Sequence, residues 1–448
     1  MSTVQLPIAF RAAEVNKILA ALLAGESCSI VGIGSVGKSN LLRFLQQKIF
    51  QLSKKDSQWS NYRLIYIDSN KLIELSTFGL YELMLFQLRL ELERQGCDLL
   101  LCESLDSLHA DLFDEKGQSL ALRYLERGIS LACDHLNYKI VFLIDEFDTL
   151  CQSLSSRTFS AFRALRDDYK YRLMYVVASR KNIHQMSKMG LEIEDFEELI
   201  TPNTIYLSTY SEYDARNMIS RLSQRYGVIL DEEKQKEILL NSGGHPGLIK
   251  ALFIGYLEDH QITDKNSSDH RQVDDECQRI WHCLSNDQQK EIVSLIENRR
   301  TDSQNSTIRD HLIQIGIIGG PWVKSDEIFS PKFTDFVKNK NPMVGAKIRI
   351  DHKGRNVFVN GFKMGKLAPL EYKLMEVLDE KRNQVVTRDE IAAELYPDDL
   401  KQDGKGVSDE RIDAVIKRLR QALEPECSES HYIITVRGHG IQLIDGVE

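Results

Sequence analysis

A glycine-rich stretch near the N-terminus has the residue types and spacing that can bind a phosphate. Residues 32–39 read GIGSVGKS and fit the pattern G-x-x-x-x-G-K-[ST]. Glycines let the backbone turn so that successive N–H groups point at one small anion. The lysine adds positive charge near the terminal phosphates, and the serine hydroxyl can ligate Mg²⁺. We expect ATP or ADP to contact Gly32, Gly34, Ser35, Val36, Gly37, Lys38, Ser39 and Asn40.

The elements on either side of this loop fit the same chemistry. The β-prone run 27–31 precedes it, and apolar residues at helical spacing follow within 41–45. A helix that begins at Lys38 points the positive end of its dipole at the loop, where it favours an anion. The alternative is a glycine-rich turn between a strand and a helix that binds no ligand.

A pair of acidic residues supplies what a bound nucleotide also needs. Residues 139–146 read KIVFLIDE, and the apolar run is typical of a buried parallel strand. Ligands bind at the carboxyl ends of such strands in open α/β sheets. We expect Asp145, together with Ser39, to hold Mg²⁺, and Glu146 to polarise the attacking water. A solvated strand end is the alternative for this pair.

Three further segments read as strands of the same sheet, namely 64–68, 173–178 and 204–207. The second of them is followed by Arg180, a cation that could reach the γ-phosphate. The alternative is an arginine that extends along the sheet edge into water. Lys38, Glu146 and Arg180 are therefore the candidate catalytic residues of an α/β fold with a parallel sheet.

The motifs GIGSVGKS, FLIDEFD and VVASR, in this order, resemble those of P-loop ATPases of the AAA+ and STAND kind over about residues 5–260. The resemblance implies a nucleotide-binding parallel sheet of the ASCE type, a helical lid and ATP hydrolysis. Residues 242–248 lack the second-sensor arginine of many AAA+ enzymes, so we expect a slow ATPase used as a switch. Residues 9–14, AFRAAE, resemble the segment that precedes the first helix in such proteins and often lies over the adenine.

The lid is expected after the last strand. Residues 211–214, SEYD, form a capping box that opens a helix, and a second helix is expected over about 232–240. The joint 242–248 reads SGGHPGL, where two glycines end one helix and a proline begins the next. The resemblance implies that His245 and Pro246 contact the base or the phosphates. Local chemistry alone indicates a plain turn.

The C-terminal part has a different order of elements. Residues 270–342 read as helices and a glycine-broken hairpin, which favours a small winged helix acting as a connector. Beyond it we expect a hairpin, three helices and a final hairpin. The pieces KLAPLEYKLMEVL, VVTRDEIAAELY, VSDERIDAVIKRLRQALEP and YIITVRGHG resemble the winged-helix effector domain of OmpR/PhoB-type response regulators over about residues 345–446.

The third of these helices has the residues of a DNA reader. Its apolar stripe, which should face the core, consists of Ile412, Val415, Ile416, Leu419 and Leu423. The opposite face carries cations and a glutamine, which suit a major groove. We expect double-stranded DNA to contact Arg411, Lys417, Arg418, Gln421 and, from the last hairpin, Arg437.

Two features weaken the electrostatic part of this expectation. Glu410 stands where members of the resembling family often carry arginine, and residues 346–448 contain 17 basic and 19 acidic residues. Because non-specific DNA affinity depends on neutralising phosphates, it should be modest here. The alternative is a winged helix that contacts protein.

Bulk composition bounds these expectations. A chain of 448 residues is too long for one core, and we expect an ATPase core at 1–207, a lid at 208–262, a connector at 270–342 and a DNA reader at 345–448. The net charge of −9 argues against a general nucleic-acid coat. The cysteines lack metal-binding spacing, and no signal peptide or membrane span is recognisable, so we expect a cytoplasmic protein with no membrane partner.

Together these features predict a DNA-binding transcription regulator switched by ATP and ADP, in which the nucleotide state of the ATPase module controls the C-terminal winged helix. Self-association on nucleotide exchange is compatible with this interpretation. Two alternatives stay open. One is a STAND-type signalling or defence ATPase whose winged helices mediate protein assembly, and the other is a DNA-remodelling or origin-type AAA+ ATPase.

Overall fold

The computed structural model has two compact units. One contains residues 1–285 and 309–332, and the other contains residues 286–308 and 333–448, so the segment expected as a connector is divided between them. The residues that the structure describes are 6–72, 74–96, 99–112, 120–183, 186, 193–261, 268–296, 306–340, 348–351, 354–359, 362–364, 367–382, 384–397, 407–423, 432–436 and 439–444.

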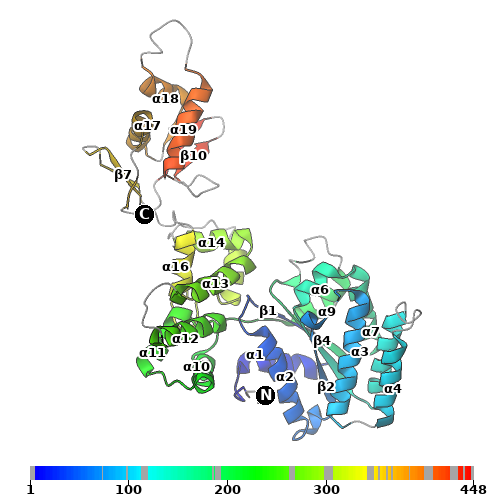
Figure 1. The fold of residues 1–448 in the computed structure, drawn as a ribbon. Coiled ribbons are helices and arrows are strands. Elements are labelled where there is room, and N and C mark those ends of the chain that lie inside the picture. Colours follow the sequence, from blue (N-terminus) through cyan, green and yellow to red (C-terminus); the bar gives the residue numbers. More distant parts are fainter. Residues whose placement is uncertain are drawn as a thin grey trace. The chain divides into compact units, whose positions relative to one another are not determined.

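The first unit is built on a five-stranded sheet in which every strand is parallel to its neighbours, in the order β2-β3-β4-β1-β5 (Figure 1). The strands are β1 (Cys28–Val31), β2 (Tyr62–Asp68), β3 (Lys139–Asp145), β4 (Leu173–Ser179) and β5 (Thr204–Tyr206). This arrangement confirms the predicted α/β fold of the P-loop NTPase type. Because parallel strands share their carboxyl edge, the loop after β1 and the acids that end β3 open at the same edge.

Helices complete the core of this unit. Those before the lid are α1 (Ala12–Leu23), α2 (Lys38–Leu52), α3 (Thr77–Arg94), α4 (Leu99–Asp111), α5 (Ala121–Ser130), α6 (Phe147–Ser153), α7 (Ser156–Asp168) and α9 (Glu194–Ile200). Side chains from α3, α5, α6, α7 and α9 pack with Phe142 and Tyr175 of the sheet in one apolar cluster. Residues of β3 and β4 are almost all buried, as expected for a sheet with helices on both faces.

The helices that follow the sheet are α10 (Glu212–Tyr226), α11 (Glu232–Ser242), α12 (Pro246–Gln261), α13 (Ser268–Cys283) and α15 (Ser306–Gln314). The Ser211 side chain accepts a hydrogen bond from the N–H of Asp214 at 3.2 Å, which confirms the predicted start of α10. Between α11 and α12, Gly243 and Gly244 have φ values of 57° and 76°. A Cβ at Gly243 would lie 1.9 Å from the carbonyl oxygen of Phe329, so this joint requires glycine.

The second unit contains α14 (Asn286–Ile296), most of α16 (Pro331–Lys340) and the C-terminal domain. The domain has a sheet of β6 (Ile348–Asp351), β7 (Asn356–Val359) and β8 (Phe362–Lys363), and another of β10 (Ile433–Val436), β11 (Gly440–Leu443) and β9 (Val385–Val386). Its helices are α17 (Pro369–Glu380), α18 (Arg388–Leu395) and α19 (Asp409–Leu423). The stripe predicted on α19 is buried in the domain core, which confirms the winged-helix interpretation.

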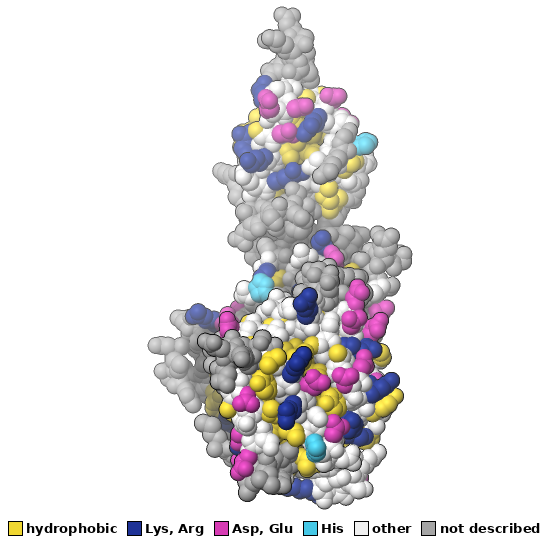
Figure 2. All heavy atoms as spheres, turned by 90° about the vertical axis from the view of Figure 1, so that its right-hand side faces the viewer, with side chains coloured by type: hydrophobic (Ala, Val, Ile, Leu, Met, Phe, Trp, Pro, Cys, Tyr) yellow, Lys and Arg dark blue, Asp and Glu magenta, His cyan; other side chains and the backbone are white. Residues whose placement is uncertain are grey.

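Membrane-spanning helices, disulfides and metal clusters do not occur among the described residues. None of the helices within the described ranges is long and apolar enough to cross a membrane. The six cysteines in the described part of the chain are free thiols, and no cluster of metal-ligating side chains occurs there. On the face of the first unit that Figure 2 presents, basic and acidic side chains are interspersed with hydrophobic ones, in keeping with the mixed composition.

Candidate nucleotide site and candidate nucleic-acid interface

The phosphate loop connects β1 to α2 through two residues with left-handed backbone. Ser35 has φ 56° and Gly37, the N-cap of α2, has φ 101°. Because α2 begins at Lys38, the N–H groups of its first turn have no acceptor within the helix and face the loop. The φ of 101° strains any residue with a side chain, and a Cβ at Gly37 would lie only 3.0 Å from the Tyr210 hydroxyl oxygen, so the position favours glycine. The loop therefore has the geometry of an anion site.

Lys38 is buried beside the loop. Its Nζ donates to the carbonyl oxygens of Gly32 at 2.8 Å and of Ile33 at 3.0 Å. Burial lowers the pKa of Lys38, and the charges of Glu146 and Asp148 oppose that effect. These electrostatic interactions mean that the loop lysine and the acids after β3, which the sequence places far apart, belong to one site.

The lid joint reaches the same loop through His245. This side chain is fully buried, and its Nε2 lies 3.0 Å from the carbonyl oxygen of Gly34. Its Nδ1 accepts from the N–H of Leu248 at 3.3 Å, so the proton is on Nε2, which donates to the loop. Burial lowers the pKa of His245 to about 4. Pro246, the first residue of α12, follows directly, and contact of either residue with a nucleotide stays a prediction.

The carboxylate of Asp145 is held by two donors. Its Oδ2 accepts from the Tyr66 hydroxyl at 2.7 Å, and its Oδ1 accepts from the N–H of Glu146 at 3.0 Å. Ser69 donates to the carbonyl oxygen of Asp145 at 2.6 Å. The side chain is thus fixed at the carboxyl edge of the sheet, which is the edge where a metal-bound nucleotide would lie. The hydroxyl partner from β2 was not predicted.

Arg180 and Glu146 form an ion pair at this edge. The Nη2 of Arg180 lies 2.7 Å from Oε2 of Glu146, and its Nε lies 3.9 Å from Oδ2 of Asp148. Glu146 has φ 50°, an uncommon backbone for a glutamate that is typical of functional sites. Asp148 is buried, and its Oδ1 has no hydrogen-bond partner among the described residues. Asp148, the third acid of the segment DEFD, was not predicted as a site residue.

The surroundings of the loop fit a bound nucleoside phosphate with Mg²⁺. The loop has the glycines, the uncapped helix start and the lysine that an anion needs, and the unpartnered oxygen of Asp148 adds to the acidic side. Ser39 follows Lys38 at the start of α2, so it and Asp145 are the residues that would hold the metal. A Cβ at Gly34 would lie 3.1 Å from Sγ of Cys283, which places the end of α13 beside the loop.

Arg11 is a second residue whose role the sequence did not reveal. It is 2% exposed and has φ 44° at the start of α1. Its Nη2 donates to the carbonyl oxygens of Val36 and Ser208, both at 2.9 Å. Its guanidinium carbon lies 4.8 Å from the centroid of the Tyr210 ring. The segment that was expected over the adenine therefore contacts the phosphate loop through Arg11, and its contact with adenine stays a prediction.

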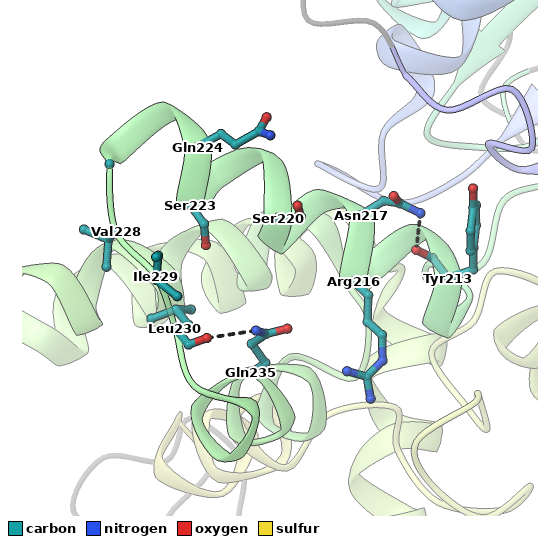
Figure 3. A pocket seen from close by; sticks show the side chains of 11 residues that line it. Tyr213, Arg216, Asn217, Ser220, Ser223, Gln224, Val228, Ile229, Leu230 and Gln235 are labelled. Atoms are coloured by element: carbon teal, nitrogen blue, oxygen red, sulfur yellow. Dashed lines mark hydrogen bonds between the residues drawn. The ribbon is translucent and has the colours of Figure 1, made fainter.

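A hollow of about 780 Å³ opens between α10 and α11, away from these residues (Figure 3). Tyr213, Arg216 and Ile229 are among the side chains around it. Within its wall, the side-chain amide of Asn217 donates to the carbonyl oxygen of Tyr213, and that of Gln235 donates to the carbonyl oxygen of Leu230. None of its lining residues belongs to the phosphate loop or to the acidic edge, so the hollow is separate from the candidate nucleotide site.

In the second unit, the outer face of α19 carries the expected DNA contacts. Arg411, Lys417, Arg418 and Gln421 are all exposed. Arg411 lies 4.6 Å from the centroid of the Tyr396 ring, and Nε of Arg418 lies 3.4 Å from Oε1 of Glu371. Arg437 lies outside the described residues. Contact of these side chains with DNA stays a prediction.

Another arginine of α19 has a different role. Arg420 donates through Nε and Nη2 to the carbonyl oxygen of Ile433, at 3.1 Å and 2.8 Å, and through Nη2 to the Thr435 hydroxyl at 2.8 Å. These bonds join α19 to β10. Arg420 therefore stabilises the domain, whereas Lys417, three residues earlier, projects into solvent.

Comparison with known proteins bears on the C-terminal part. The family described as "Transcriptional regulatory protein, C terminal" matches residues 363–443. A probable transcriptional regulatory protein of Picosynechococcus sp. is 36% identical over 74 residues, 16% of this chain and 28% of that protein. The two-component response regulator PhoP of Pseudomonas aeruginosa is 36% identical over 74 residues, 16% of this chain and 30% of that one. The chain therefore spans less than a third of the length of these relatives.

Solved structures match both parts of the chain. A Walker-type ATPase of Pyrococcus abyssi has a TM-score of 0.47 at 14% identity, covering 74% of this chain and 96% of that one. The DNA-binding domain of RstA from Klebsiella pneumoniae, in complex with the RstA box, has a TM-score of 0.19 at 24% identity, over 22% of this chain and 91% of that one. The motifs and the strand order described above show that the first unit has a P-loop NTPase fold. Residues 363–443 form a domain of the transcriptional regulatory protein C-terminal family.

Proposed function

We propose that this protein is a DNA-binding transcription regulator whose activity depends on the nucleotide that its first unit holds. The observation that carries the proposal is that the loop after β1, with the buried Lys38, and the acids that end β3 lie at the carboxyl edge of one parallel sheet. A C-terminal domain of the regulatory family occurs in the same chain. In this proposal residues 1–207 are the ATPase core, 208–262 the lid, 270–342 the connector and 345–448 the DNA reader.

The residues of the site have distinct roles in this proposal. The N–H groups of the loop and the first turn of α2 bind the phosphates, and Lys38 moves from the loop carbonyl oxygens to the terminal phosphates. Ser39 and Asp145 would hold Mg²⁺, which would supply neutralisation of phosphate charge when bound. Glu146 accepts a proton from the attacking water once its pairing with Arg180 is broken. Arg180 then stabilises the charge that develops on the γ-phosphate, so that its role depends on the triphosphate.

The DNA reader acts through α19. Its outward residues suit the major groove, where arginine and lysine bind guanine or phosphate and glutamine binds adenine. The relatives from Picosynechococcus and Pseudomonas are named as transcriptional regulators, which supports the same use here. Because the domain is not strongly basic, most of its affinity must come from specific contacts rather than from the phosphate backbone.

One experiment tests the coupling. DNA bound by the full chain would be selected from a random pool, and its affinity measured by fluorescence anisotropy with ADP, with a non-hydrolysable ATP analogue, and for Lys38→Ala. The proposal expects at least a fivefold difference between the two nucleotides, about 1 kcal/mol, because a nucleotide shifts two states only by its differential affinity for them. It expects no nucleotide effect in Lys38→Ala. Equal affinities in all three conditions would exclude the switch.

A second function is favoured by one observation. The hollow beside α10 exposes Tyr213 and Ile229, of which Ile229 is 96% exposed, and large exposed apolar side chains are typical of protein contacts. A signalling ATPase that assembles with protein through its lid would use this surface. Selection that recovers no DNA, together with nucleotide-dependent self-association in sedimentation velocity, would favour this second function.

A further inference from the structure

Side chains hold four carbonyl oxygens of the phosphate loop, and two of these side chains come from outside the loop. Lys38 binds those of Gly32 and Ile33, His245 binds that of Gly34, and Arg11 binds that of Val36. Only the lysine belongs to the loop itself. The histidine comes from the lid joint, and the arginine from the segment before α1.

Holding these carbonyl oxygens orients the N–H groups that follow them. In a trans peptide the C=O and the next N–H point in opposite directions, and no cis peptide occurs in the described part of the chain. The bond to the Gly34 oxygen therefore directs the N–H of Ser35, and the bond to the Val36 oxygen directs that of Gly37, away from the clamping side chains. Those are N–H groups that a phosphate would use.

The hydrogen-bonding capacity of His245 is already used by protein. Its Nε2 donates to Gly34 and its Nδ1 accepts from Leu248, in a side chain with no exposed surface. A neutral imidazole has one donor and one acceptor, so no ring nitrogen remains for the base or the phosphates. The glycine joint before it, which cannot accommodate a side chain at Gly243, fixes the entry of α12 and hence the position of the imidazole.

Arg11 ties the loop to the other lid helix. The Nη2 that binds the Val36 oxygen also binds the Ser208 oxygen, in the link from β5 to α10. The backbone N–H of Arg11 lies 3.4 Å from both carboxylate oxygens of Asp214, in the first turn of α10. Because the side chain is buried and its charge is partly met by Glu14 at 3.0 Å, the guanidinium has a fixed place.

We propose that His245 and Arg11 are positioning residues that hold the phosphate loop by its carbonyl oxygens. The loop therefore binds a nucleotide phosphate tightly only while α10 and α12 are seated, that is, placed relative to the loop as in this structure. The proposal rests on the nucleotide binding proposed above and gives it a physical link to the lid. Nucleotide affinity then reports lid position, and by reciprocity the nucleotide stabilises the seated lid. His245 acts through Gly34 and not by touching the nucleotide.

The test compares two variants that differ in one hydrogen bond. His245→Asn keeps an acceptor for the Leu248 N–H but lacks a donor that reaches the Gly34 oxygen. His245→Gln keeps a donor near the position of Nε2. We expect ADP binding to weaken about tenfold in His245→Asn and much less in His245→Gln, as measured by calorimetry on the full chain. His311→Asn is the control, because His311 is half-buried and packs against Tyr206 rather than the loop.

A second measurement needs no nucleotide. Hydrogen exchange at the amides of Ser35 and Gly37 should be about tenfold faster in His245→Asn than in the wild type or in His311→Asn, since the loop has lost an anchor. Arg11→Met should speed exchange at Gly37 in the same way. If the wild type binds no nucleotide, the proposed function fails while this exchange still tests the clamp. Unchanged exchange and unchanged ADP affinity in His245→Asn, with only a lower Tm, would mean that His245 merely packs the lid, and would overturn the proposal.

Discussion

The phosphate loop and the outer face of α19 are built in opposite ways. Around the loop, Lys38, Arg11 and His245 are buried, and each has defined hydrogen-bond partners. On α19, Lys417 and Gln421 are exposed side chains that must become ordered when they bind. The first site is preorganised, so one substitution should have a large effect on function. The second is adaptable, so single substitutions there should have smaller effects.

The largest expected effect is on hydrolysis. Glu146→Gln keeps the size of the side chain but removes the base, so turnover should fall by about 10²- to 10⁴-fold while nucleotide binding is retained. Single-turnover phosphate release measures it. Glu212→Gln is the control, since Glu212 also pairs with an arginine, Arg216 at 2.8 Å, but lies on the lid surface. Equal turnover in wild type and Glu146→Gln would remove Glu146 from the chemistry.

The next effect is on nucleotide affinity. Lys38→Ala removes the buried ammonium group of the loop, and charge-assisted hydrogen bonds of this kind contribute about 1.5–3 kcal/mol, so ADP and ATP binding should weaken by about 100-fold. Calorimetry checks it. Lys48→Ala, on the same helix, removes an ammonium group that donates at the surface to the carbonyl oxygen of Ile8 and should leave affinity unchanged. Similar losses in both variants would indicate that any positive charge on α2 matters, and that the loop is not preorganised.

The two regions also differ in how far the sequence predicts them. Apolar runs fixed the strands of the sheet, because continuous burial in β3 and β4 needs residues such as those at 140–144. The stripe of α19 was equally visible, since one face of a helix repeats every three or four residues. These features are local along the chain, and the structure has them where they were predicted.

The supports of the nucleotide site were not visible in the same way. Arg11 meets Val36, and Tyr66 meets Asp145, only because strands and helices distant in sequence come together. Asp148 reaches the site because α6 turns back directly after β3. The helices α3, α4 and α5 between β2 and β3 were not predicted either, as no motif marks them. Sequence patterns marked the residues that are proposed to meet a ligand, whereas the residues that hold them in place depend on tertiary packing.

A pH series sharpens the preorganised side of the comparison. The pKa of His245 is about 4 in the folded chain, below the usual value of about 6.5, because burial disfavours the imidazolium. As pH falls from about 6.5 towards 4, the unfolded chain takes up a proton that the folded chain does not, so stability is lost over that window. Between pH 7 and pH 5 this side chain should account for about 2 kcal/mol of lost stability.

The free energy of unfolding would be measured by denaturant titration at pH 7 and at pH 5, from the transition in which the first unit unfolds. His245→Gln cannot take up that proton and should lose about 2 kcal/mol less than the wild type over this range. His311→Gln is the control for a second histidine whose pKa is lowered by burial. An identical pH dependence in wild type and His245→Gln would show that the imidazole is not sealed in the closed lid.

The smallest effects are expected on α19, where two cations three residues apart have different roles. Lys417→Ala removes an exposed cation, so DNA affinity should fall by about 1 kcal/mol at unchanged Tm, and the slope of log K against log salt should drop by about one if the ammonium group meets a phosphate. Arg420→Ala removes the bonds to Ile433 and Thr435, so the domain should lose about 1 kcal/mol of stability with the salt slope unchanged.

Anisotropy titrations over a range of salt concentrations and thermal unfolding of the same samples separate these outcomes. A Lys417 variant that loses stability and keeps its DNA affinity would mean that α19 faces something other than DNA. An Arg420 variant that lowers the salt slope would mean that this arginine leaves β10 to bind phosphate. In either case the outer face of α19 would not be the adaptable surface that its exposure implies, and the contrast with the buried phosphate loop would no longer hold.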